Sequence, residues 1–204
     1  MSQLLKITAR IISFIFHPLL IPTLGFLVLM NINFYFSYLP SQMKRALFLV
    51  ILTTTFILPG ITFLLMNISP KFDLKMEKIK DRIVPLMATV LFYYIGYFLL
   101  LQFRVYPVYR VFLISVILTL ITLLMITMRW KISLHMAGIA GLTGAIVALS
   151  FRLGNNTSIL VSMLICVAGL LGTSRLLLGK HDLNQILAGY TVGFVMNFMI
   201  IFFI

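Results

Sequence analysis

Long runs of apolar residues, separated by short polar connections, make up most of this chain of 204 residues. A membrane-spanning helix needs about 20 consecutive, mostly apolar residues. Seven runs are predicted as spans on this criterion: 11–33, 46–67, 83–103, 108–128, 134–151, 158–178 and 183–203. Because the connections are too short to form a soluble domain, we expect a single membrane domain over residues 1–204. The expected fold is all-α, a polytopic helical bundle with about six to seven transmembrane helices.

Two of these runs have unusual features. The first follows Lys6 and Arg10, as the apolar core of a signal peptide would, but it is too long for such a core and is predicted to be a retained span. The fifth run is short and rich in glycine. Within it Ala137, Gly141 and Ala145 recur every four residues, a spacing that predicts close packing against another helix.

The composition narrows the class of protein. Hydrophobic residues make up 62% of the chain and charged residues 10%, against about 45–50% and about 25% in soluble domains. This excludes a soluble globular protein and a disordered one. The net charge of +12 indicates membrane orientation, anionic lipid or a phosphate-bearing substrate rather than nucleic acid. The single cysteine, Cys166, excludes an internal disulfide framework and is expected to be packed among apolar neighbours.

Polar residues concentrate on one side of the predicted bundle. With seven spans, the N-terminus and the connections after the second, fourth and sixth runs share a side. That side carries eleven of the sixteen Lys and Arg residues, all four acids, and both His135 and His181. The positive-inside rule would explain the cations by marking this side as cytoplasmic, but it does not explain the histidines. Some of these cations could instead be there to bind phosphate, so the sequence leaves the sidedness open.

The connection over residues 70–82 is predicted to form an amphipathic helix at the membrane surface. Ser69 and Pro70 are typical of a helix start. Its basic residues fall on one helical stripe: Lys71, Lys75, Lys78 and Arg82. Two interpretations stay open, a solvated connector or a basic face directed at an anionic group.

The connection between the sixth and seventh runs combines structural and chemical signals. Gly179 is predicted to end one helix, and Asp182 to begin the next as the first member of a capping box with Gln185. These roles do not account for Arg175, which lies in an apolar helix end and needs an anionic partner. They do not account for His181 at the break either.

Two further groups of polar residues have alternative explanations. Ser133 and His135 precede the glycine-rich run, where a hydroxyl, an imidazole and unpaired backbone N–H groups could bind an oxyanion. Alternatively, Ser133 caps the helix and His135 lies at the interface. His17, with Pro18 and Pro22 after it, is either functional or bonded to a carbonyl that a proline kink has freed.

These segments resemble the three motifs of the type 2 phosphatidic-acid phosphatase superfamily, which includes the haloperoxidases. Ser174 and Arg175, followed after five residues by His181, resemble its third motif, S-R-x5-H-x3-D. The second motif, P-S-G-H, is similar to the segment Ser133-Leu134-His135, and the first, K-x6-R-P, is similar to Lys75 with Arg82. The order matches over roughly residues 75–190. The chain departs from the motifs at four positions: Ile83, Ile132, Leu134 and Gln185, where the family has Pro, Pro, Gly and Asp.

The resemblance implies a membrane lipid phosphatase that forms a phosphohistidine and uses no metal or other cofactor. His181 would be the nucleophile and His135 the general acid, with Gln185 in the place of the orienting carboxylate. The phosphate oxygens would be held by Lys75, Arg82, Ser133, Ser174 and Arg175. The substrate would be a lipid phosphate or a polyprenyl diphosphate. We expect membrane lipids as partners, no nucleic acid, and a multi-pass location in a cell membrane such as the bacterial inner membrane.

Two other functions remain as alternatives. Gln185 brings no negative charge, which suggests a family member that binds a lipid phosphate without hydrolysing it. His17, the prolines and the glycines suggest a small membrane transporter. A transporter predicts a polar path through the bundle, whereas a phosphatase predicts a pocket open at one rim.

Overall fold

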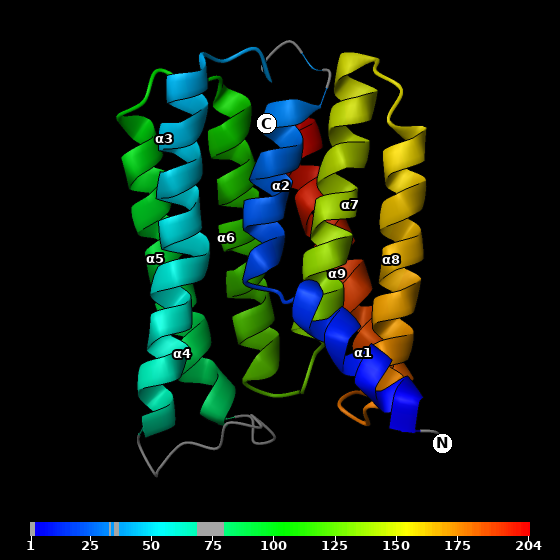
Figure 1. Cartoon of the computed structure of the whole chain (residues 1–204). Coiled ribbons are helices and arrows are strands. Elements are labelled where there is room, and N and C mark those ends of the chain that lie inside the picture. The colour runs from blue at the N-terminus through cyan, green and yellow to red at the C-terminus, as the bar shows by residue number, and fades with distance from the viewer. Residues whose placement is uncertain (1–2, 33, 35–36, 69–79) are drawn as a thin grey trace. The chain divides into compact units, whose positions relative to one another are not determined.

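The computed structural model describes residues 3–32, 34, 37–68 and 80–204, and every regular element in these ranges is a helix (Figure 1). Most of the predicted connector 70–82, with Lys75, lies outside the described residues. Within these ranges six helices are long and apolar enough to cross a membrane, and a bent pair near the N-terminus could add a seventh crossing. The predicted class, an all-α multi-pass membrane protein, is confirmed.

Six of the predicted runs each coincide with one long helical segment, because an apolar run of this length can bury its backbone polar groups in lipid only as a helix. Five of the segments are single α-helices: α5 (Lys80–Leu101), α6 (Pro107–Thr127), α7 (Leu134–Leu153), α8 (Ser158–Leu177) and α9 (Leu183–Phe203). The sixth is continuous but contains a π turn, and comprises α3 (Ser41–Leu52), η2 (Thr53–Ile57) and α4 (Leu58–Ile68).

The first predicted run, 11–33, is a bent pair rather than one straight helix. Helix α1 (Gln3–Ile15) and helix α2 (Leu20–Asn31) are bent by 60° at the break between them. Pro18 lies in this break. Proline has no backbone N–H and disfavours helical geometry in the residue before it, so the helix does not continue through this point. The kink suggested by the prolines is confirmed.

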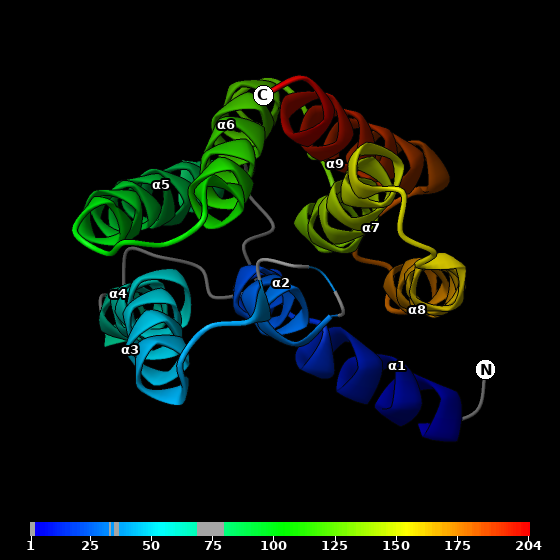
Figure 2. The same cartoon turned by 90° about the horizontal axis from the view of Figure 1, so that it is seen from above.

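The helices form two compact units, Met1–Ile21 with Ile132–Ile204, and Pro22–Lys131. In the first unit α7 packs against α8 and α9, and α1 packs against α8 (Figure 2). Helix α7 is the most buried of the six long helices described.

Cys166 on α8 is exposed rather than packed among apolar neighbours, contrary to expectation.

Helices α7 and α9 pack backbone against backbone. A Cβ atom added to Gly193 would meet the backbone of Ala137, and one added to Gly144 would meet a backbone carbonyl of α9. A Cβ on Gly189 would lie 2.5 Å from the carbonyl oxygen of Ser133. The close packing predicted for the glycine-rich run is therefore confirmed, and α9 is its partner. This contact fixes the start of α7 against the start of α9.

In the second unit, polar side chains inside apolar helices bond to one another around η2. The hydroxyl oxygens of Thr23 and Thr55 are 2.7 Å apart, and the Tyr93 hydroxyl donates to the backbone carbonyl of Thr55 at 3.2 Å. Thr54 donates its hydroxyl to the carbonyl of Val50 at 2.8 Å. A π turn shifts the backbone hydrogen-bond ladder, and side-chain donors then help to satisfy the displaced carbonyls. We call Thr23, Thr54, Thr55 and Tyr93 the η2 cluster.

Candidate functional site

The turn between α8 and α9 is short and is held by a cap at each end. Gly179 has a positive φ of 62°, and its N–H donates to the carbonyl of Leu176 at 2.9 Å. The N–H of Lys180 donates to the carbonyl of Arg175 at 3.1 Å, which completes a Schellman motif. At the start of α9, Asp182 accepts the N–H of Gln185 at 2.8 Å. Both predicted caps are confirmed.

His181 lies between the two caps, only 8% exposed, and contacts the side chain of Gln185. Its Nδ1 is 2.8 Å from the Oε1 of Gln185. Because an amide oxygen can only accept, Nδ1 carries the proton, and the lone pair of the neutral ring is on Nε2. The expected capping box is thus half formed: Asp182 caps the helix, whereas Gln185 orients His181.

Ser133 occupies the N-cap position of α7, but its side chain does not cap the helix. Its backbone N–H donates to the carbonyl of Gln185 at 3.2 Å, which ties the start of α7 to the start of α9. Its hydroxyl is fully buried and has no hydrogen-bond partner in the part of the chain that the structure describes. The interpretation of Ser133 as a simple side-chain cap is therefore wrong. An unmade hydrogen bond in such a position costs about 1–3 kcal/mol.

His135, in the first turn of α7, connects this helix to the N-terminal segment. Its Nε2 lies 3.2 Å from the backbone carbonyl of Ser13, and it must be the donor because the carbonyl can only accept. The ring of His17 packs edge-on against that of His135, with ring centroids 5.5 Å apart. The Nδ1 of His17 accepts the N–H of Leu19 at 3.4 Å, so the bond found at this nitrogen is not the suggested one to a freed carbonyl.

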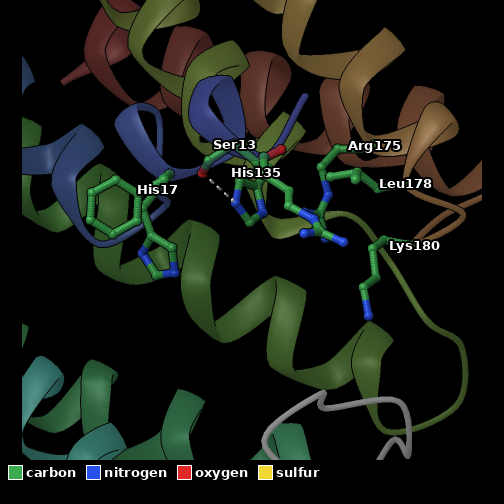
Figure 3. Close-up of a pocket in the computed structure, with 8 residues that line it drawn as sticks. Ser13, His17, His135, Arg175, Leu178 and Lys180 are labelled. Atoms are coloured by element: carbon green, nitrogen blue, oxygen red, sulfur yellow. Dashed lines mark hydrogen bonds between the residues drawn. The ribbon is translucent and has the colours of Figure 1, made fainter. Parts of the chain in front are cut away.

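A cavity of about 520 Å³ opens beside His135 (Figure 3). Its described lining residues are Arg10, Ser13, Phe14, His17, His135, Arg175, Leu178 and Lys180. Figure 3 shows the Arg175 side chain reaching toward the His135 ring, with Lys180 extending into the same opening. His135 interacts electrostatically with Arg175, His17 and His181. None of the lining residues just named is acidic, so the cavity suits an anion.

The structure brings most of the predicted third and second motifs into one region. His135 and Arg175 line the cavity, whereas His181, Gln185 and Ser133 lie at the adjacent helix starts. A histidine with a fixed tautomer is thus placed near a second histidine and near cations.

Three other predicted phosphate ligands are placed differently. Ser174 is buried and donates its hydroxyl to the carbonyl of Leu170 at 2.7 Å, and it is not among the lining residues. Arg82 is 9% exposed and belongs to the second unit. Lys75 lies outside the described residues. The site is therefore built here from the first unit alone.

Sequence reasoning missed part of the lining. Arg10 was weighed only as a cation on one side of the membrane, and Ser13 was not considered. Residues spaced by three and four positions share a helical face; Arg10 and Ser13 of α1 have this spacing, and His17 continues it just past the end of the helix. That periodicity was the signal that could have found them.

Neither metal-binding groups nor comparisons with known proteins identify a function for this site. Across the ranges that the structure covers, no group of three or more His, Cys, Asp or Glu side chains is arranged to hold a metal ion. No family model, curated protein or solved structure matches the chain. Its function must therefore be argued from the site itself.

Proposed function

We propose that this protein is an integral membrane lipid phosphatase that hydrolyses a phosphate monoester or diphosphate of a lipid through a phosphohistidine. The observation that carries the proposal is the 2.8 Å contact between His181 Nδ1 and Gln185 Oε1, next to an acid-free cavity with a second histidine. A neutral imidazole whose far nitrogen is held by a partner is a competent nucleophile. The motif order that resembles the type 2 phosphatidic-acid phosphatases supports the same chemistry.

The proposed reaction has two steps. In the first, Nε2 of His181 attacks the phosphorus, the bond from phosphorus to the leaving oxygen breaks, and His135 gives that oxygen a proton. In the second, water attacks the phosphorus, the P–N bond breaks, and His135 takes a proton from the water. Inorganic phosphate leaves and both histidines return to their starting states. These steps require no metal or cofactor.

Charge neutralisation is the other requirement, because phosphoryl transfer depends mainly on positioning and on stabilising the negative oxygens. Arg175 and Lys180 line the cavity and are proposed to hold those oxygens. The buried hydroxyl of Ser133 would donate to one of them. The resemblance also implies Lys75 and Arg82 as phosphate ligands, but the site proposed here is built without them.

The surroundings of the cavity favour an amphiphilic substrate. Phe14 and Leu178 line the cavity alongside its cations, and Phe14 is 76% exposed. A charged head group could enter while its acyl or prenyl tail stays among apolar side chains and lipid. We place the protein in the cell membrane, a bacterial inner membrane, as part of this proposal.

The test is phosphate release by the purified protein in lipid nanodiscs, with phosphatidate and a polyprenyl diphosphate as separate substrates. We expect His181→Asn to lower the rate by on the order of 10³-fold or more. Quenching with SDS at alkaline pH during turnover of ³²P-labelled substrate should trap acid-labile, alkali-stable label on the wild type and none on His181→Asn. Asn184→Ala, at an exposed position three residues away, is the matched control and should keep its activity. Equal release by the wild type and His181→Asn would overturn the proposal.

A second candidate function is binding of a lipid phosphate without hydrolysis. Gln185 favours it, since an amide fixes the tautomer of His181 but supplies no negative charge to stabilise an imidazolium or a phosphohistidine. In this case the wild type would bind a lipid phosphate, release no phosphate and trap no label.

A further inference from the structure

Helix α1 belongs to none of the three motifs, yet it forms one wall of the cavity. Arg10, Ser13 and His17 line the cavity from one face of this segment. Several apolar side chains of α1 are exposed, with Leu4 at 75% and Phe14 at 76%. Helix α1 therefore places polar side chains at a cavity whose described lining residues include no acid, and apolar side chains where lipid would contact them. We expect it to contribute to the site as well as to membrane attachment.

The Ser13 hydroxyl is a hydrogen-bond donor that a ligand in the cavity could satisfy. The residue is 8% exposed, it lines the cavity, and its hydroxyl has no hydrogen-bond partner among the described residues. An unmade hydrogen bond at a buried donor is unfavourable. A phosphate oxygen in the cavity would accept it. His17 offers a second donor, because its Nδ1 accepts the N–H of Leu19 and its proton is therefore on Nε2.

The Ser13 carbonyl has a different role. The last carbonyls of a helix lack partners within the helix, and here the N–H of Phe16 takes the carbonyl of Ile12 while the N–H of His17 takes that of Phe14. The Ser13 carbonyl between them accepts Nε2–H of His135 at 3.2 Å. The working nitrogen of His135 is then Nδ1.

We infer that α1 is the second half of the site, in which Arg10, the Ser13 hydroxyl and His17 bind the phosphate group of the ligand and the Ser13 carbonyl positions His135. The end of α1 thereby fixes the tautomer and orientation of His135, one of the roles of an orienting carboxylate, in a site whose described lining residues include no acid. The positioning role rests on the proposed function, whereas the binding role does not require turnover.

The binding role is tested with a non-hydrolysable phosphonate analogue of phosphatidate, in nanodiscs of zwitterionic lipid, by equilibrium binding. We expect Arg10→Gln to raise the Kd about 10-fold or more and Arg10→Lys to restore part of the loss. Ser13→Ala should raise the Kd a few-fold. Lys6→Gln is the matched control, one turn earlier on the same helix, exposed and outside the lining, and should stay within about twofold. Equal affinities of Arg10→Gln and Lys6→Gln would overturn the binding role.

A competition arm separates the two sources of the phosphate group. Inorganic phosphate at millimolar concentration should displace the analogue only weakly if the tail contributes to binding. Complete displacement at a concentration equal to that of the analogue would overturn the assignment to a lipid and assign the cavity to free phosphate.

The positioning role is tested by ¹⁵N NMR of the imidazole groups, since the chain has only three histidines and single substitutions can assign them. We expect His135 to be protonated on Nε2 in the wild type. Pro18→Ala lets the helix continue, so that the N–H of residue 17 competes for the Ser13 carbonyl. This variant should show mixed tautomers of His135 and a kcat about 10-fold lower at an unchanged KM. Protonation of wild-type His135 on Nδ1 would overturn the positioning role.

The two proposals fail in distinguishable ways. Analogue binding that depends on Arg10, without any phosphate release, would refute the phosphatase and leave the binding role of α1 standing. Phosphate release that is the same in the wild type, Arg10→Gln and Lys6→Gln would support the phosphatase and refute the role of α1.

Discussion

The η2 cluster of the second unit and the cavity of the first unit both place polar side chains among apolar helices. They differ in whether those polar groups have hydrogen-bond partners. In the cluster, Thr23 bonds to Thr55, and Tyr93 donates to the Thr55 carbonyl. In the first unit, the buried hydroxyls of Ser13, which lines the cavity, and of Ser133, at the start of α7, have no partner within the described ranges. Polar groups that satisfy one another hold helices together, whereas groups left unsatisfied are available to a ligand.

An unsatisfied hydroxyl is not sufficient by itself. The hydroxyl of Thr127, in the second unit, is also buried and without a partner in the described part of the chain. The hydroxyl of Thr157, in the first unit, is in the same condition, and neither threonine is among the described residues that line the cavity. The unsatisfied hydroxyl of Ser13, in contrast, lines the cavity together with His17, His135 and Arg175. It is this combination that distinguishes a candidate site from an isolated defect in hydrogen bonding.

The largest expected effect comes from the side-chain pair of His181 and Gln185. Gln185→Leu removes the acceptor that fixes the tautomer of His181 but keeps the backbone N–H that Asp182 caps. We expect phosphate release to fall by on the order of 10³-fold, as expected when a reacting histidine loses its orienting partner. Gln185→Asp is the matched control and should be at least as active as the wild type, because it restores negative charge. Initial rates measure both, and an unimpaired Gln185→Leu variant would contradict the assignment.

A smaller effect, with opposite signs for activity and stability, is expected for Ser133→Ala. Removing a buried hydroxyl that has no partner should raise the free energy of unfolding by about 1 kcal/mol. It should also lower phosphate release about 10-fold, because a donor to the phosphate is lost. Ser115→Ala is the control, since the hydroxyl of Ser115 donates to the carbonyl of Phe112 at 2.7 Å and its removal should not stabilise the protein. Unfolding in SDS and initial rates give both quantities. A destabilised Ser133→Ala variant would show that its hydroxyl is satisfied after all.

The smallest effect is expected in the η2 cluster. Tyr93→Phe removes the bond to the Thr55 carbonyl and should lower the free energy of unfolding by about 1 kcal/mol. Phosphate release should stay within about twofold of the wild type, because the cluster is structural. Loss of phosphate release without a lower free energy of unfolding would contradict the assignment of the η2 cluster to structure and the cavity to function.

The long helices could be predicted from the sequence because the thickness of a bilayer fixes the length of the apolar run that crosses it. The caps at Gly179 and Asp182 were predictable for a similar reason, since their chemistry is local. The side-chain partner of Gln185 was not. The spacing from Asp182 predicts a capping box, yet the nearby imidazole of His181 takes the amide oxygen instead. Which partner the Gln185 side chain takes depends on side-chain geometry, and the spacing of residues in the sequence does not reveal that geometry.

The contact between α1 and His135 could not be predicted, for another reason. Ser13 and His135 are 122 positions apart in the sequence and meet through the Ser13 carbonyl, a group that every residue carries. No residue type marks such a contact. The partner of the glycine-rich run was equally undetermined, because small residues indicate close packing but not against which helix.

The division of the first unit along the chain has a consequence for biogenesis. Its two segments, Met1–Ile21 and Ile132–Ile204, are separated by the whole of the second unit. Synthesis runs from the N-terminus, and units fold as they become complete. Helix α1 is therefore in the membrane without the other helices of its unit until α7, α8 and α9 have been inserted. We expect the nascent chain to hold no complete cavity until Lys180, the last of the described lining residues in the sequence, has been synthesised.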